Sequence, residues 1–86
     1  HNAATIDGMI PEGASGFKGR ISEPFEAGFE VSGFYGIKCS PHFGMGMVML
    51  IKVGEADMPA HYASVDMPER SRPRMDDLLK RAVNAP

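Results

Sequence analysis

The apolar residues of this chain gather in short runs in its middle and recur in a spaced pattern near its end. Residues 34–38 are aromatic and β-prone, and residues 48–53 form a second apolar run, so each predicts a strand. Residues 1–33 are rich in Gly, Pro and Glu. They predict mostly loop, with a turn cluster at 12–16 and a weak strand at 25–29.

The pattern changes after residue 55, where prolines punctuate a segment that then becomes helical. Four apolar residues follow the i, i+3, i+4, i+7 spacing of a one-sided helix: Met75, Leu78, Leu79 and Ala82. Acidic residues come early in this segment and basic residues late, which suits the helix dipole. We therefore expect a mainly β fold, with residues 1–55 as the β region and 56–86 as a tail of one or two helices.

Composition narrows the classes of protein. A chain of 86 residues makes at most one small domain, whose core is marginal without a metal or another staple. Cys39 is the single cysteine, so no internal disulfide can form. The net charge of −2 gives no reason to expect nucleic acid binding, and no apolar run reaches the length of a membrane span.

The densest chemistry lies in the stretch YGIKCSPHFGMGMVM, residues 35–49. Cys39, His42 and Met47 are spaced Cys-x2-His-x4-Met between the two predicted strands. A thiolate, an imidazole and a thioether are ligands of a blue-copper electron-transfer site, which also needs a second histidine. The candidates are His1 and His61, of which His61 lies in the proline-punctuated tail.

Two segments, HNAATIDGMIPEGASGFKGRI and GFYGIKCSPHFGMGMVMLIKVG, resemble the pseudoazurins, a family of small bacterial cupredoxins with type 1 (blue) copper. The resemblance covers residues 1–55 closely and the tail loosely. It implies one bound copper ion, Cu(I) or Cu(II), and selects as its ligands His1, Cys39, His42 and Met47. It thereby disfavours Met45 as the axial methionine.

The resemblance also implies how the thiolate is tuned. The backbone N–H of Asn2 would donate a hydrogen bond to the Cys39 sulfur. Pro41 has no N–H to donate, which would leave that sulfur with fewer hydrogen bonds. Fewer such bonds make the thiolate a better donor to copper and tune its reduction potential.

The implied fold is a cupredoxin-like Greek-key β-sandwich followed by the helical tail. The chain begins at the first predicted ligand, and its predicted strands are too few for two packed sheets. We therefore expect residues 1–86 to be the C-terminal part of a single cupredoxin domain. The N-terminal strands would then lie on another chain or outside this sequence.

The implied function is that of a periplasmic one-electron carrier in denitrification, not an enzyme. Its partner would be a copper nitrite reductase or another periplasmic redox protein, with no nucleic acid or membrane partner. His42 would reach solvent at one edge of the copper site. The residues expected to surround that edge and dock the partner are Lys18, Arg20, Lys38 and Phe43.

Two further functions are compatible with the same residues. The chain could deliver copper through its methionines, or it could be a thiol enzyme with Cys39 as nucleophile and His42 as base. A thiol enzyme is disfavoured because no third group that would orient the histidine is visible. A lone cysteine is most often a small buried hydrophobe, and a run of methionines is often core filler.

Overall fold

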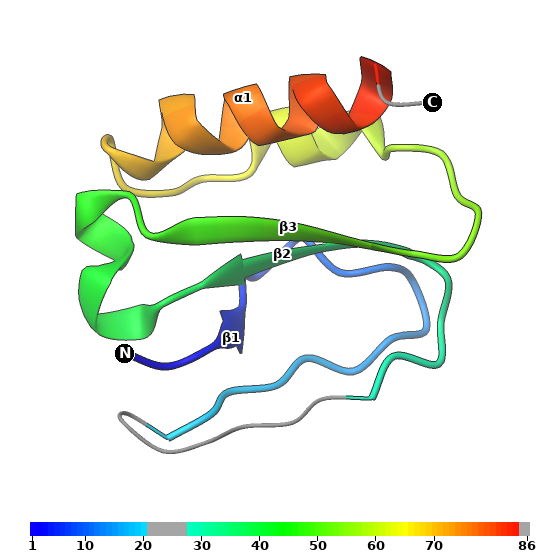
Figure 1. Cartoon of the computed structure of the whole chain (residues 1–86), viewed down its shortest axis with the longest axis horizontal. Helices are drawn as coiled ribbons and strands as arrows, with labels where there is room; N and C mark the ends of the chain where they lie inside the picture. Colours follow the sequence, from blue (N-terminus) through cyan, green and yellow to red (C-terminus); the bar gives the residue numbers. More distant parts are fainter. Residues whose placement is uncertain (21–27, 85–86) are drawn as a thin grey trace.

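The computed structural model describes residues 1–20 and 28–84, and within them it contains a three-stranded antiparallel sheet (Figure 1). The strands are β1 (Ala4–Thr5), β2 (Gly33–Lys38) and β3 (Val48–Val53), in the spatial order β1-β2-β3. The predictions of strands at 34–38 and 48–53 are confirmed. Of the weak strand predicted at 25–29, residues 25–27 lie outside the described residues, and residues 28 and 29 belong to no strand.

Among the described residues, three helical elements accompany the sheet: the 3₁₀ helices η1 (Ser40–Met45) and η2 (Ala60–Ser64), and the α-helix α1 (Ser71–Asn84). The predicted helical tail is confirmed. Pro73 lies in the first turn of α1, where its missing N–H removes no intrahelical hydrogen bond. In the part of the chain that is described, no helix is both long and apolar enough to cross a membrane.

The core lies between the sheet and the helices that cover one of its faces (Figure 1). Side chains alternate along β2, so Phe34 points towards α1 and η2 while Tyr35 points to the other face. The buried core cluster consists of Ile6, Met9, Phe34, Tyr62, Met75 and Leu79. The Tyr62 hydroxyl donates a 2.7 Å hydrogen bond to the Phe34 carbonyl, which ties η2 to β2.

A second aromatic group covers the opposite face of the sheet. Tyr35 packs edge-on against Phe29, with ring centroids 4.8 Å apart, and Phe29 packs against Phe17 at 6.0 Å. The Tyr35 hydroxyl donates to the Val31 carbonyl at 2.6 Å. Phe17 and Phe29 thus form an aromatic cluster with Tyr35, although neither belongs to a strand.

The N-terminal residues are held against the end of β2. Ala4 pairs with Lys38 in the sheet, and it also bridges Lys18. The Thr5 N–H donates to the Phe17 carbonyl at 2.9 Å. A turn at residues 11–14, in which Gly13 has φ of 86°, reverses the chain between these two segments. This pairing carries residues 1 and 2 to the place where β2 gives way to η1.

Candidate metal centre

The loop from Cys39 to Met47 is closed by backbone hydrogen bonds. Cys39 is extended and caps η1, and Pro41 lies in the first turn, where proline suits a helical start. The Cys39 N–H donates to the Met47 carbonyl at 3.1 Å, and the Met47 N–H donates to the His42 carbonyl at 3.2 Å. Gly46, with φ of 88°, ends η1 in the left-handed conformation that glycine adopts readily. The three loop residues predicted as ligands therefore belong to one closed unit.

Three metal-binding side chains meet at this loop. The Cys39 Sγ lies 3.6 Å from the Nδ1 of His1 and 3.6 Å from the Nδ1 of His42, and the two Nδ1 atoms are 3.2 Å apart. In the described part of the chain, this is the group of His, Cys, Asp and Glu side chains that could hold a metal. His61 lies elsewhere, with its Nε2 3.1 Å from the Gly8 carbonyl. The structure thus brings His1, and not His61, to the thiol.

The spacing of these donors suits one ion. Imidazole nitrogen and thiolate sulfur bind metals such as zinc at about 2.0–2.3 Å, so three ligands at 120° lie roughly 3.5–4.0 Å from one another. The separations of 3.2 and 3.6 Å are close to that range. Two imidazoles and one thiolate in a trigonal set are the strong ligands of a blue-copper centre. The donor set therefore fits copper.

The two methionines of the loop differ in exposure. The Met47 side chain is 44% exposed and that of Met45 is 66% exposed. The backbone of Met47 forms hydrogen bonds with the backbones of Cys39 and His42. Met45, in contrast, is the last residue of η1 and directly precedes Gly46. This bonding places the backbone of Met47 beside the donor cluster and supports its choice over Met45.

Asn2 fastens the N-terminal segment to the loop. Its backbone N–H donates to the Cys39 Sγ at 3.4 Å, the hydrogen bond that the family resemblance implies. Its side-chain Nδ2 donates to the Gly19 carbonyl and to the Ser40 Oγ, both at 3.1 Å, and its Oδ1 accepts the Ser40 N–H at 2.6 Å. This side-chain role was not predicted from the sequence. The available signal was a polar pair, Asn2 and Ser40, in which each residue directly follows a predicted ligand.

Three of the residues predicted to dock a partner, Lys18, Lys38 and Phe43, are connected by a shared cavity and a ring contact. Lys18 and Lys38 line one surface cavity of about 400 Å³, together with Ser40 and the acidic Asp7. The Lys38 Nζ lies 5.0 Å from the centroid of the Phe43 ring, within the range of a cation–π contact. Arg20 is exposed and follows Gly19, whose carbonyl accepts from Asn2.

The three donor residues differ in exposure. His42, the ligand expected to reach solvent, is half-buried, and His1 is exposed. Cys39 is buried between them, with 3% of its surface exposed. The exposed edge therefore includes both imidazoles.

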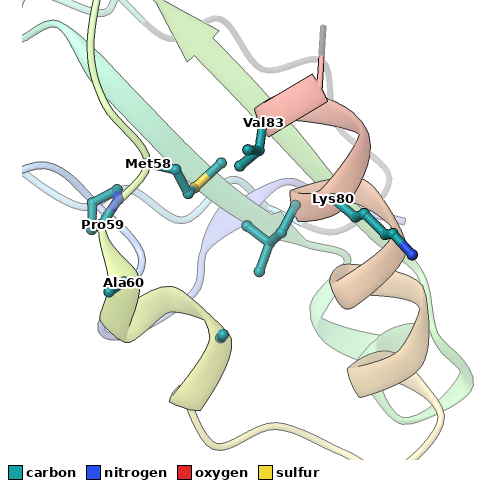
Figure 2. A pocket seen from close by; sticks show the side chains of 7 residues that line it. Met58, Pro59, Ala60, Lys80 and Val83 are labelled. Atoms are coloured by element: carbon teal, nitrogen blue, oxygen red, sulfur yellow. The ribbon is translucent and has the colours of Figure 1, made fainter.

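The most apolar cavity has no part in this site. It measures about 380 Å³ and lies between η2 and the C-terminal half of α1, and Figure 2 shows the Lys80 side chain pointing away from it. It is lined by Met58, Pro59, Ala60, Ala63, Leu79, Lys80 and Val83. The donor cluster lies beside η1, at the other end of the helix layer (Figure 1).

Comparison with known proteins agrees with the donor set. A family model of copper-binding proteins, the plastocyanin/azurin family, matches residues 1–54. Over 77 residues the chain is 44% identical to a pseudoazurin of Paracoccus pantotrophus, a match that covers 88% of this chain and 53% of that protein. The chain thus spans about half the length of the curated relatives that it matches.

Solved structures give the same result. The crystal structure of pseudoazurin from Methylobacterium extorquens matches with a TM-score of 0.84 and 36% identity over 95% of this chain and 68% of that one. A pseudoazurin structure from Sinorhizobium meliloti matches with a TM-score of 0.87 and 32% identity over 100% of this chain and 68% of that one. The expected cupredoxin fold is confirmed, and this chain belongs to the pseudoazurins within the plastocyanin/azurin family of copper-binding proteins.

Proposed function

We propose that this protein is a periplasmic one-electron carrier, and that His1, Cys39, His42 and Met47 hold its copper. The observation that carries this proposal is the convergence of one thiol and two imidazole Nδ1 atoms within 3.6 Å of one another. The membership of the chain in a copper-binding family supports it.

The protein's part in such a site is to supply donors that suit both oxidation states and to keep them in place. A bound copper ion supplies the one-electron couple. The thiolate of Cys39 favours Cu(I), and the imidazoles tolerate Cu(II). Asn2 anchors both Cys39 and the following residue, so the donors need little rearrangement when the oxidation state changes.

The burial of Cys39 argues against a thiol enzyme. A nucleophilic cysteine must reach its substrate and is usually partly exposed. Cys39 is 3% exposed, and both imidazoles beside it direct Nδ1 towards the sulfur. A side chain enclosed in this way suits a metal ligand better than a nucleophile.

The basic surface next to the proposed copper site supports the proposal of an acidic partner. Lys18 and Lys38 border the same cavity beside Ser40, and Phe43 adds an aromatic surface next to Lys38. We propose that these residues, with Arg20, receive a copper nitrite reductase or another acidic periplasmic redox protein in denitrification. Positive charges at such an edge chiefly accelerate association and select the partner.

The test is the rate of electron transfer from the reduced protein to a copper nitrite reductase, measured by stopped flow. Lys18→Ala combined with Lys38→Ala should lower the second-order rate several-fold at low salt. The loss should shrink near physiological ionic strength, where the Debye length is about 8 Å. The reduction potential should stay nearly unchanged.

The matched control is Lys80→Ala combined with Arg81→Ala. It removes the same charge from α1 at the end remote from η1 (Figure 1). The chain has a net charge of −2, so its overall charge does not favour an acidic partner, and any attraction must be local. Equal slowing by both pairs would mean that total charge accounts for the effect and would refute the docking surface.

One observation favours copper delivery as a second candidate function. Met45, Met47 and Met49 are 66%, 44% and 53% exposed, and exposed thioethers bind Cu(I). A delivery protein would exchange Cu(I) readily with a chelator and would have no stable blue Cu(II) form. A lasting blue colour with slow loss of copper to a chelator would exclude this alternative.

A further inference from the structure

Ser71, the first residue of α1, directs a buried hydroxyl at the loop from Cys39 to Met47. Ser71 is 0% exposed, so its hydroxyl is shielded from solvent. Its Oγ donates a hydrogen bond to the Phe43 carbonyl in η1. A buried hydroxyl that lacked this acceptor would carry a desolvation penalty, so the bond holds helix and loop together.

The acceptor lies in the middle of the loop. The Phe43 carbonyl also accepts the Gly46 N–H at 3.1 Å, so both of its lone pairs are engaged. One of these bonds comes from the helix, and the other closes the turn that leads into Met47. The position of this carbonyl therefore links α1 to the segment between the predicted ligands His42 and Met47.

Packing against Arg70 and Arg74, which flank Ser71 in the chain, holds the same segment as well. Gly46 is buried, and a Cβ placed on it would lie 3.0 Å from the Arg70 carbonyl oxygen and 3.7 Å from the Arg74 Nε. The backbone that precedes α1 thus lies directly against the turn before Met47. The loop is confined between the helix start and the Cys39 end of β2 (Figure 1).

We propose that Ser71 is a positioning residue for the copper site, acting through the Phe43 carbonyl to fix where the loop places Met47. This inference rests on the proposed function, in which Met47 is the axial ligand. A thioether would be a weak donor to copper, so the position of the loop would have a large share in setting how closely Met47 approaches the ion. The start of α1 would then tune the reduction potential although none of its side chains binds copper.

Three measurements on Ser71→Ala test the proposal. In the copper-free protein, the amides of Gly46 and Met47 should exchange with solvent faster, on the order of fivefold for one lost hydrogen bond. In the copper protein, the ratio of the visible absorption bands should change. The reduction potential should rise in the same direction as in Met47→Leu, and by less.

The control is Leu79→Ala, which removes core packing from the same helix. Leu79 lies in the core cluster and lines the cavity beside η2, about two turns of α1 after Ser71. It should lower the melting temperature and leave the exchange of the Gly46 and Met47 amides, the band ratio and the potential unchanged.

The outcomes separate this inference from the proposed function. If Ser71→Ala lowers stability like Leu79→Ala but moves neither amide exchange nor potential, Ser71 is only a structural residue and the proposal is wrong. If the unaltered protein gives no blue form at all, the proposed function fails. In that case, amide exchange in the copper-free protein would still show whether Ser71 restrains the loop.

Discussion

Replacement of Asn2 by alanine should destabilise the fold and disturb the metal site together. The substitution removes three side-chain hydrogen bonds, of 2.6, 3.1 and 3.1 Å, that join the N-terminal segment to Ser40 and Gly19. Each such bond contributes about 1 kcal/mol net, and these are only partly buried, so we expect a loss of about 2–3 kcal/mol in the free energy of unfolding. The backbone N–H of residue 2 would remain but would no longer be held against the Cys39 sulfur.

The assay is urea unfolding of the copper-free protein, followed by far-ultraviolet circular dichroism, because bound copper would add its own stabilisation. The visible spectrum of the copper-loaded variant provides the second readout. Thr5→Val is the matched control, since it removes the 3.1 Å hydrogen bond from the Phe17 N–H within the same segment. It should cost about 1 kcal/mol and leave the spectrum unchanged. The proposed role of Asn2 is refuted if Asn2→Ala costs no more than Thr5→Val, or if its spectrum is that of the unaltered protein.

Two further predictions concern the axial ligand and the core. Met47→Leu should keep the blue colour and raise the reduction potential measured by voltammetry, because a weak donor that stabilises Cu(II) is lost. Met45→Leu should change the potential much less. Equal shifts in the two variants would show that Met47 is the wrong choice of axial ligand. Burial, with a smaller contribution from Tyr35, raises the pKa of Tyr62 above its ordinary value of 10.0. The folded state therefore favours the neutral phenol, so the free energy of unfolding should hold below about pH 10 and fall as pH rises through the folded-state pKa. Urea unfolding between about pH 8 and pH 11 checks this, and Tyr62→Phe should remove that part of the pH dependence; an unaltered decline in this variant would assign it to another group.

The features predicted correctly from the sequence are those that depend on the types of neighbouring residues along the chain. Residues 34–38 and 48–53 are apolar runs next to glycine, and the spacing of Met75 and Leu79 follows one helix face, so neighbouring residues suffice to predict β2, β3 and α1. The loop that contains Cys39, His42 and Met47 could also be recognised, because these residues lie within nine positions of one another. The 3₁₀ helix within this loop was not predicted.

The features that the sequence did not predict depend on contacts between distant segments. Asn2 meets Ser40 across 38 positions, and Ser71 meets Phe43 across 28. Both are ordinary polar residues until the sheet and α1 bring their partners within reach. The choice between His1 and His61 likewise rested on family resemblance. The antiparallel pairing of β1 with β2 brings His1 to Cys39, and no pattern of residues in the sequence predicts that pairing.

The central claim is that the Cys39 thiolate binds copper together with His1 and His42. The most direct test is the visible spectrum during titration of the purified protein with Cu(II). We expect an intense charge-transfer band from a Cu(II)–thiolate bond, because thiolate is the one soft anionic ligand in the cluster. The band should be absent in Cys39→Ser and unchanged in His61→Ala. An equally intense band in the serine variant, or no band in the unaltered protein, would contradict the claim.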